Sequence, residues 1–195
     1  MGIRSKMEKA EKATLKRAGL DWQHMRVCEL GNQYNHVHKK AAKKVYLSRN
    51  VIEHVSIDLN GRDGSISLDL CDPLPEHFVS KFNMVTNYGT SEHVKDQYQV
   101  FKNMNDVCCV GGFMFHTLVF PNSWRGHGRY YYPTEFVESL SIQCQYAIDH
   151  IEKIKKPKKA LILVVYKKSK IGFIGRSDFE KIPIIDTQNM SRVGA

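Results

Sequence analysis

Apolar residues recur along this chain at two spacings, one typical of helices and the other typical of strands. The helical spacing predicts helices over residues 5–18, 35–47, 91–103 and 133–154. Short continuous or alternating apolar runs predict strands over residues 25–31, 51–59, 65–70, 82–86, 107–120 and 159–168, and another within 179–185. Because strands alternate with helices, the pattern predicts an α/β fold, with a mostly parallel sheet of about seven strands and helices on both faces.

The length of 195 residues and the 42% hydrophobic content exclude a disordered, collagenous or coiled-coil chain. We expect a single domain over residues 1–195, with an N-terminal helix in 1–20, a core over 25–186 and a flexible tail over 187–195. The apolar runs are too short to span a bilayer and no apolar signal region follows the N-terminus, so we expect a soluble cytoplasmic protein. An odd number of cysteines without a C-x-x-C pair fits a reducing compartment: Cys28, Cys71, Cys108, Cys109 and Cys144.

The formal net charge of +9 is concentrated in two segments. Seven Lys and Arg fall between Arg4 and Arg26, and eight Lys without any acid fall between Lys153 and Lys170. Such segments attract nucleic acid or anionic lipid, but lysines also form the solvated faces and guarded edges of ordinary helices and strands. No aromatic residues interleave the N-terminal lysines as a base-stacking surface needs. We therefore expect a small-molecule substrate and keep nucleic acid as the alternative partner.

Polar residues and a glycine follow successive predicted strands, where ligands bind in parallel sheets. Gly31 allows close backbone approach after the first strand, and the amides of the next helix favour an anion. Asp58 follows the second strand, where it can accept hydrogen bonds from ribose hydroxyls, and Asp69 can accept from the exocyclic amine of adenine. The candidate cofactor-binding residues around this adenosine site are Glu29, Gly31, Asn32, Gln33, Asp58, Leu59, Asp69, Leu70, Asn87 and Tyr88.

These residues carry a resemblance to a known family over about residues 25–165. The order and spacing of the matching stretches resemble class I (Rossmann-like) S-adenosylmethionine-dependent methyltransferases. They are Val-Cys-Glu-Leu-Gly-Asn (27–32), Ser-Ile-Asp-Leu-Asn (56–60), Ser-Leu-Asp-Leu (67–70), Phe-Asn-Met-Val-Thr-Asn (82–87), Ser-Glu-His-Val (91–94) and Gly111-Gly112. The resemblance implies a Rossmann-like doubly wound sheet, S-adenosyl-L-methionine as cofactor and methyl transfer by in-line displacement. The chain departs from the family at Asn32 and Gln33, where further glycines are usual, and at Asn87, where an acid is frequent.

Methyl transfer needs a general base only when the acceptor carries a proton that it does not lose freely. The candidate bases are His93, His116 and His127, and for each of them a structural role is the competing interpretation. His127 lies in a loop, residues 124–132, that is crowded with aromatic and cationic side chains. Arg125, Arg129 and Tyr130 of that loop are the candidate substrate-binding residues, since guanidinium groups bind acidic or phosphorylated substrates.

We expect no metal site, because His36-x-His38 and Cys108-Cys109 lack the spacing of zinc ligands and the adjacent cysteines are most simply core residues. The leading functional hypothesis is methyl transfer to a small polar acceptor, such as a sugar or a related metabolite.

Two other functions stay open. A nucleic-acid (RNA) methyltransferase would use the Lys-rich segments, although Asn-Tyr-Gly-Thr (87–90) stands where amino-methylating nucleic-acid enzymes carry Asn-Pro-Pro-Tyr. A non-catalytic, methyltransferase-like partner protein is the third hypothesis. A nicotinamide dehydrogenase is disfavoured, because the chain lacks the G-x-G-x-x-G run and carries Asp69, which that cofactor does not require.

Overall fold

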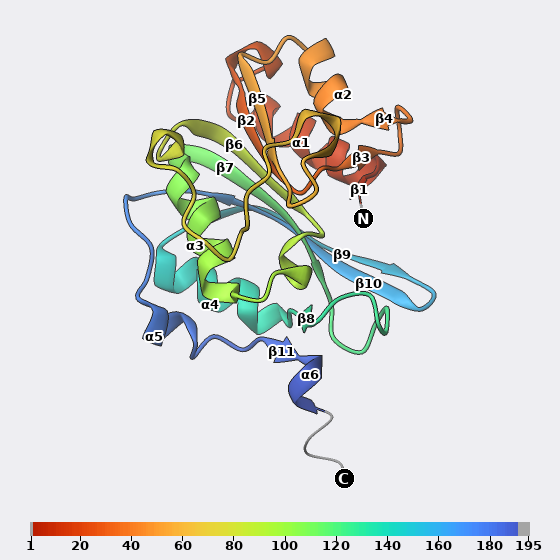
Figure 1. Ribbon diagram of the computed structural model, residues 1–195, viewed down its shortest axis with the longest axis vertical. Coiled ribbons are helices and arrows are strands. Elements are labelled where there is room, and N and C mark those ends of the chain that lie inside the picture. Colours follow the sequence, from red (N-terminus) through yellow and green to blue (C-terminus); the bar gives the residue numbers. More distant parts are fainter. Residues whose placement is uncertain (1, 191–195) are drawn as a thin grey trace.

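The computed structural model describes residues 2–190 and contains a central sheet with helices on both faces (Figure 1). Its six strands run in the order β5-β2-β6-β7-β10-β9. They comprise β5 (Glu53–Ile57), β2 (Arg26–Leu30), β6 (Phe82–Tyr88), β7 (Cys108–Val119), β10 (Lys159–Lys167) and β9 (Ala147–Lys156). Pairing is parallel from β5 to β7, and the last two strands each run antiparallel to their neighbour. The mostly parallel α/β sheet is thus confirmed, with six strands where about seven were expected.

Both faces of the sheet are buried. Helices α1 (Ser5–Arg17) and α2 (Ala42–Ser48) pack on one face, and α3 (Gln97–Val107) and α4 (Thr134–Cys144) pack on the other. Successive side chains of a strand point to opposite faces, so β7 contributes to both cores. Phe113 and Phe115 join the core under α1 and α2, whereas Met114 and Leu118 join the core under α3 and α4. This explains why β7 and β10 carry apolar residues without alternation over most of their length.

Shorter elements close the edges of the molecule. Strands β1 (Gly2–Ile3), β3 (Tyr34–Asn35) and β4 (Lys40–Ala41) form a small separate sheet, and β8 (Tyr130–Tyr131) pairs with β11 (Ile185–Asp186). The remaining elements are α5 (Arg176–Phe179), α6 (Thr187–Met190) and the 3-10 turns η1 (Trp22–His24), η2 (Arg62–Gly64), η3 (Glu76–Phe78) and η4 (Ser91–His93). The expected tail, residues 187–195, begins in α6, and its residues 191–195 lie outside the described part of the chain.

Three predicted segments differ because polar side chains end or delay an element. The helix expected over residues 35–47 begins only at Ala42, because Asn35 Oδ1 accepts the amides of Val37 and His38 and turns the chain into the β3–β4 hairpin. The strand expected over residues 65–70 is reduced to a single bridge between Ile57 and Ile66. The helix expected over residues 91–103 begins at Gln97, where the Asp96 side chain caps it.

The largest error concerns the helix expected over residues 133–154. It ends at Cys144, because Gln145 adopts a left-handed φ of 56°, and the chain then continues as strand β9. The short strand expected within residues 179–185 is limited to its end, at β11. Within residues 2–190, no helix is both long and apolar enough to cross a membrane.

A buried polar cluster joins α1 to α2 and to the sheet. Glu11 is fully buried, and its Oε1 accepts hydrogen bonds from the Tyr46 hydroxyl at 2.6 Å and the Tyr88 hydroxyl at 2.8 Å. Burial raises the pKa of Glu11 to about 7, against the lowering effect of these bonds and of Arg49. The N-terminal helix is therefore attached through a titratable group that has no access to water.

Candidate cofactor-binding site

The turn after β2 requires a glycine. Gly31 has a φ of 81°, and a Cβ on this residue would lie 2.4 Å from Thr90 Oγ1 and 2.8 Å from Gln33 Nε2. The Gly31 amide donates to the carbonyl of Ile57 at 2.7 Å, which ties the turn to the end of β5. The single glycine of this loop therefore stands where its backbone lies against the side chain of Thr90, in the loop after β6.

The Glu29 side chain stabilises this turn through a hydrogen bond to its backbone. The side chain is buried, and its Oε1 accepts the amide of Gln33 at 2.9 Å while its Oε2 lies 3.0 Å from His54 Nε2. Burial raises the pKa of Glu29, opposed by its bonds to His54 and Gln33. Glu29, a predicted cofactor-binding residue, does not line the cavity described below. It acts on the loop indirectly, by holding the amide of Gln33 in place.

Asp58 joins the ends of β2 and β5. One of its oxygens accepts the Asn32 amide at 2.8 Å, and the other accepts the Asn60 amide at 3.0 Å. An ionised carboxylate has about four lone-pair sites, so each oxygen of Asp58 can still accept a further bond. The Asn32 side chain donates to Asp63 at 2.9 Å, which extends the polar rim.

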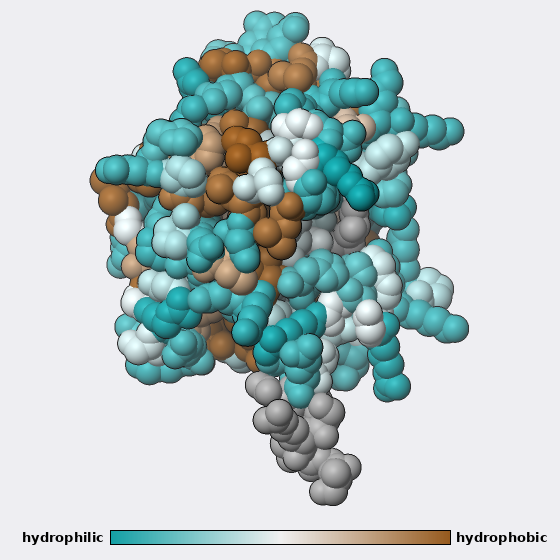
Figure 2. Space-filling model, viewed as in Figure 1, coloured by the Kyte–Doolittle hydropathy of each residue, from teal (hydrophilic) through white to brown (hydrophobic). Residues whose placement is uncertain are grey.

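A cavity of about 520 Å³ opens beyond the carboxyl ends of β2, β5 and β6. This volume lies in the ordinary range for small-molecule sites. The predicted residues that line it are Gly31, Asn32, Gln33, Asp58, Leu59, Asp69, Leu70 and His93. The sequence analysis missed the other lining residues, which are Ile57, Leu68, Cys71, Gly89, Thr90, Val94 and Lys95. Figure 2 shows hydrophobic residues gathered in the middle of this face, where the loop between β5 and β6 crosses the molecule in Figure 1.

Asn87 and Tyr88 lie outside this lining. The Asn87 side chain donates to Ser91 Oγ at 2.9 Å and accepts the amide of Ser91 at 3.1 Å, so it shapes the turn into η4. Tyr88 points to the opposite face of the sheet, toward Glu11. The cavity is instead lined by the next two residues, Gly89 and Thr90. Gly89, a glycine directly after strand β6, was the feature of the sequence that could have indicated these two residues.

The three candidate histidines have different surroundings. His116 is buried, stacks on Phe101 with ring centroids 5.8 Å apart, and burial lowers its pKa to about 3. His93 lines the cavity, and desolvation lowers its pKa. His127 stacks on Trp124 with ring centroids 3.5 Å apart, and its Nε2 lies 3.3 Å from a carboxylate oxygen of Glu92. The structure therefore brings His93 and His127 near the cavity and keeps His116 within the core.

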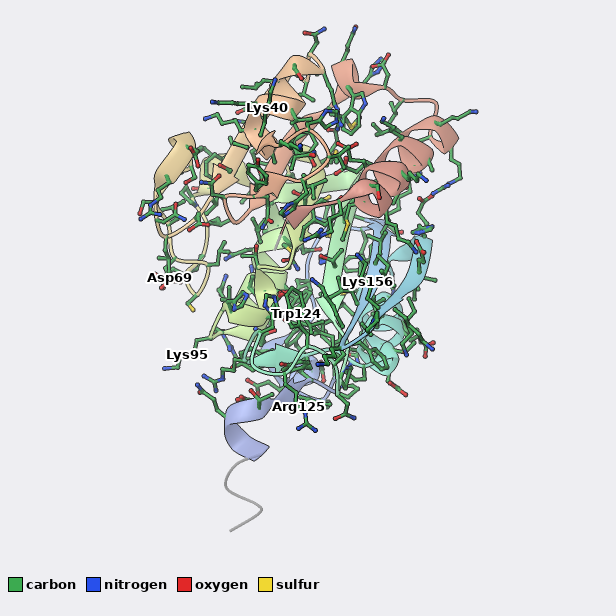
Figure 3. All side chains as sticks on the ribbon, turned by 90° about the vertical axis from the view of Figure 1, so that its right-hand side faces the viewer. Lys40, Asp69, Lys95, Trp124, Arg125 and Lys156 are labelled. Carbon is green, nitrogen blue, oxygen red and sulfur yellow. The ribbon has the colours of Figure 1, made fainter. Side chains whose placement is uncertain are left out.

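The three candidate substrate-binding residues, Arg125, Arg129 and Tyr130, also have different surroundings. Arg129 binds Asp186 through two nitrogens at 2.9 and 2.6 Å, and Tyr130 donates to the carbonyl of Lys95 at 2.9 Å. Arg125 is exposed and extends outward from its loop, away from Asp69 and Lys95 (Figure 3). Arg129 is thus bound within the protein, and Tyr130 lines a second cavity.

That cavity, of about 750 Å³, adjoins the first one. The two share Cys71 and Lys95 in their linings. Its walls combine aromatic and charged side chains, namely Tyr98, Tyr130, Phe179, Asp96, Arg176, Glu180 and Asp186. Two of these residues are paired with each other, since the guanidinium nitrogens of Arg176 donate to the carboxylate oxygens of Asp96 at 3.0 and 2.8 Å.

Comparison with known proteins places the fold in a class. No protein-family model matches the chain, and no curated protein sequence is significantly similar to it. Solved structures do match. A 1,6-didemethyltoxoflavin-N1-methyltransferase from Burkholderia thailandensis, with bound 1,6-didemethyltoxoflavin and S-adenosylhomocysteine, aligns at a TM-score of 0.63 and 9% identity, over 85% of this chain and 79% of that one.

An S-adenosylmethionine-dependent methyltransferase from Mesorhizobium loti aligns at a TM-score of 0.58 and 14% identity, over 80% of this chain and 95% of that one. The [4+2]-cyclase SpnF aligns at a TM-score of 0.60 and 13% identity, over 83% and 81% of the two chains. The chain therefore has the class I S-adenosylmethionine-dependent methyltransferase fold. The cyclase is a reminder that this fold also occurs in a protein named for different chemistry.

Proposed function

We propose that this protein is an S-adenosyl-L-methionine-dependent methyltransferase that acts on a small polar acceptor. The observation that carries the proposal is the convergence of Gly31, from the turn after β2, and of Asp58 and Asp69, from the loop after β5, on one cavity beyond the carboxyl ends of the strands. The expected single domain, with its two helical layers on one sheet, is part of the same proposal.

The residues around the first cavity fit this cofactor. Asp58 retains lone pairs for ribose hydroxyls, and Asp69 is an exposed acceptor on the same cavity wall for an adenine amine. Leu59 and Leu70 provide apolar contact for the base. The amide-rich turn after Gly31 suits a single carboxylate, which needs fewer glycines than a pyrophosphate does. When bound, the cofactor supplies an electrophilic methyl group on a sulfonium sulfur.

The second cavity is the proposed acceptor site. Its shared wall, formed by Cys71 and Lys95, would bring an acceptor close to the cofactor, and such positioning is worth roughly 7–11 kcal/mol in favourable cases. Its mixture of aromatic and charged residues suits a small polar molecule. The Burkholderia thailandensis structure, which contains bound 1,6-didemethyltoxoflavin and S-adenosylhomocysteine, supports a small-molecule acceptor.

His93 is the best-placed of the candidate bases. It lines the cofactor cavity, and its lowered pKa keeps the imidazole neutral at pH 7, where it can accept a proton from an acceptor hydroxyl or amine. His116 is buried in the core and has no such access. A base of this kind typically contributes about 10²–10⁴-fold to the rate.

Calorimetric titration with S-adenosylhomocysteine tests the cofactor site. We expect Asp58→Asn to weaken binding by about 100-fold or more, because hydrogen bonds to a charged acceptor contribute roughly 1.5–3 kcal/mol each. Asp72→Asn is the matched control, since this exposed carboxylate lies in the same connecting loop outside the cavity lining. Equal affinity in both variants, or no binding by the wild type, would reject the proposal.

A specific observation favours RNA methylation as the second candidate function. The two Lys-rich segments meet in space, where Arg4 and Lys6 face Lys156 and Lys159 across a groove of about 290 Å³. A nucleic-acid partner would bind there with an affinity that falls steeply with salt. Fluorescence anisotropy with single-stranded RNA at low salt tests this, and we expect Lys156→Glu to abolish any such binding. The absence of binding at low salt would remove this candidate.

A further inference from the structure

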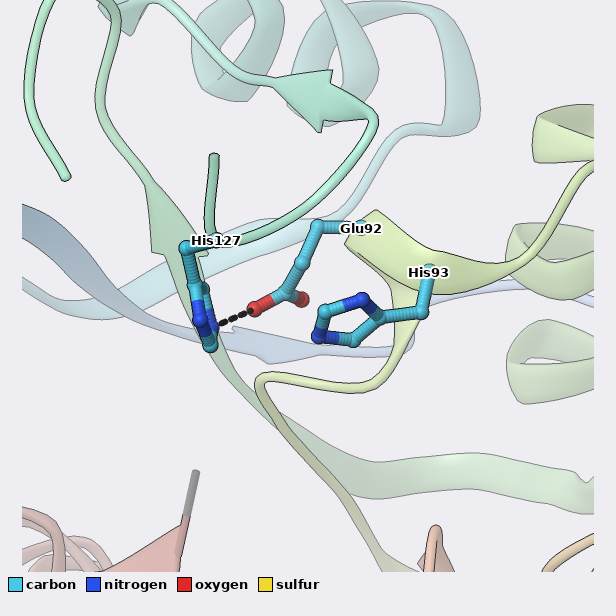
Figure 4. A group of neighbouring side chains, drawn as sticks. All are labelled: Glu92, His93 and His127. Carbon is cyan, nitrogen blue, oxygen red and sulfur yellow. Dashed lines mark ion pairs between the residues drawn. The ribbon is translucent and has the colours of Figure 1, made fainter. Parts of the chain in front are cut away.

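Three side chains with metal-binding atoms meet beside the cofactor cavity. Glu92 and His93 both come from η4, and His127 comes from the loop before β8 (Figure 4). One ligand atom from each lies within 4.8 Å of the other two. His93 also lines the cofactor cavity, so the cluster opens toward the proposed reaction site.

Glu92 is a carboxylate without an observed hydrogen-bonding role. It is fully buried, and within residues 2–190 neither carboxylate oxygen has a hydrogen-bond partner. A buried carboxylate is costly unless a cation or several donors compensate its charge. Its surroundings therefore call for a cation close to these oxygens.

His127 is positioned to share such a cation. Its Nε2 lies 3.3 Å from Glu92 Oε1, without the alignment of a hydrogen bond. Two ligands on a tetrahedral ion, at bond lengths of about 2.0–2.1 Å, are separated by about 3.3 Å. Stacking on Trp124, with an interplanar angle of 2°, fixes the orientation of the imidazole.

The protein backbone holds the two segments together independently of any ion. The Arg129 amide donates to the carbonyl of Glu92 at 2.9 Å. Gly128 packs so closely that a Cβ on it would lie 2.7 Å from Glu92 Cγ. The cluster is therefore built into the fold, and a preformed ligand set lowers the cost of binding.

We propose that Glu92, His93 and His127 bind a divalent transition-metal ion such as Zn²⁺ or Mn²⁺. Two imidazoles and one carboxylate select ions of this kind over Ca²⁺ and Mg²⁺, which prefer oxygen ligands. Three protein ligands leave coordination positions open. If the proposed methyl transfer holds, an acceptor oxygen at one of them would have its pKa lowered and its orientation fixed. His93 would then act as a ligand, and the ion would replace it in activating the acceptor.

This conclusion departs from the expectation of no metal site. His36-x-His38 and the paired cysteines were the local patterns in the sequence, whereas these ligands are separated by a helix and a long strand. The simpler alternative is an ion pair between a protonated His127 and Glu92, and the experiment must separate the two.

The experiment uses the full chain, stripped with a chelator and titrated calorimetrically with Zn²⁺ and with Mn²⁺. We expect one tightly bound ion per chain, and affinity reduced about 100-fold or more by Glu92→Gln, His93→Ala or His127→Ala. Of the three ligands only His93 has an exposed side chain, so His93→Ala is the variant whose folding is least affected. His38→Ala is the control for adventitious binding at the exposed His36-x-His38 pair. Absence of binding, unchanged binding in the three variants, or loss in the control would overturn the proposal.

Titration with S-adenosylhomocysteine in the same metal-free preparation keeps this proposal distinct from the methyltransferase proposal. We expect Asp58→Asn to lose the nucleoside ligand and keep the metal, and His127→Ala to do the reverse. Metal binding without any nucleoside binding would reject the methyltransferase and retain the metal site.

Discussion

At the scale of single residues, two glycines with the same backbone conformation have different surroundings. Gly31 has a φ of 81° and Gly111 a φ of 82°, so a side chain strains both positions equally. Apart from the glycine and its two chain neighbours, no described atom lies within 4 Å of a Cβ on Gly111, whereas a Cβ on Gly31 would overlap Thr90 Oγ1. A substitution at Gly111 therefore measures backbone strain alone, whereas the same substitution at Gly31 adds the clash with Thr90 beside the cavity.

We expect Gly111→Ala to lower the free energy of unfolding by about 1–2 kcal/mol, the cost of a left-handed alanine. Gly31→Ala should cost more, because the turn must also move away from Thr90. Only Gly31→Ala should weaken S-adenosylhomocysteine binding. Urea denaturation and calorimetry of both variants measure these effects, and equal losses in both assays would contradict the role given to Gly31.

At the scale of elements, α1 is held by two carboxylates with opposite titration behaviour. Burial raises the pKa of Glu11 to about 7. Burial acts in the same direction on Glu8, but hydrogen bonds from Asn35 and Arg49 outweigh it and lower the pKa of that group. Folding therefore favours the protonated form of Glu11 and the ionised form of Glu8, although both belong to the same helix.

This difference predicts opposite pH dependences of stability. The folded pKa of Glu11 exceeds its unfolded value, so its favourable contribution is complete below about pH 4.5 and is lost as the pH rises to about 7. Relative to Glu11→Gln, the wild type should lose on the order of 3 kcal/mol across that window. Glu8 stabilises above the unfolded pKa and loses its contribution as the pH falls. Urea titrations at pH values from below 4.5, where Glu8 loses its contribution, up to pH 8, where Glu11 has lost its own, test both. Parallel curves for wild type and Glu11→Gln would disprove the assignment.

The sequence predicted elements well where hydrophobic spacing alone decides them, as in α1, β6, β7 and β10. It failed where a polar residue or a single left-handed residue ends a pattern, as Gln145 does between α4 and β9. Ile148 and Ile151 continue the helical spacing past that point, although they belong to an edge strand where they are partly exposed. Spacing cannot reveal a change of backbone conformation at one residue.

At the scale of the whole molecule, two cores share one sheet. Residues of β7 and β10 enter both cores alternately, so neither core can unfold while the other keeps its strands. The two tryptophans report on different regions, since Trp22 packs beside Tyr46 near α2 and Trp124 beside His127. We expect Trp22→Phe and Trp124→Phe variants to unfold in urea with one midpoint by fluorescence and circular dichroism. Separate midpoints would contradict the single domain.

The candidate site was predictable where strand order determines it. Gly31 and Asp58 follow strands β2 and β5, and the rule for ligands at strand ends brings them to one cavity. Asp69 reaches the same cavity for another reason, because the strand expected before it does not form and the residue lies in the loop that follows β5.

The prediction of Asn87 and Tyr88 missed the cavity lining by two residues, because Gly89 and Thr90 line it in their place. The Asn87 side chain instead bonds Ser91, and the Tyr88 side chain bonds Glu11 on the opposite face of the sheet. Neither the second cavity nor the approach of His127 to Glu92 follows from the sequence, because both depend on how distant loops close over the sheet.

Lys95 belongs to the walls of both cavities, and the Tyr130 hydroxyl holds its carbonyl at 2.9 Å. A ligand that moves this wall from one side therefore changes the affinity for a ligand on the other side. Thermodynamic linkage makes such an effect reciprocal, so the factor by which the first ligand alters binding of the second equals the factor in the opposite direction. Order of addition cannot change that factor, and a variant at the shared wall should alter both affinities through one coupling free energy.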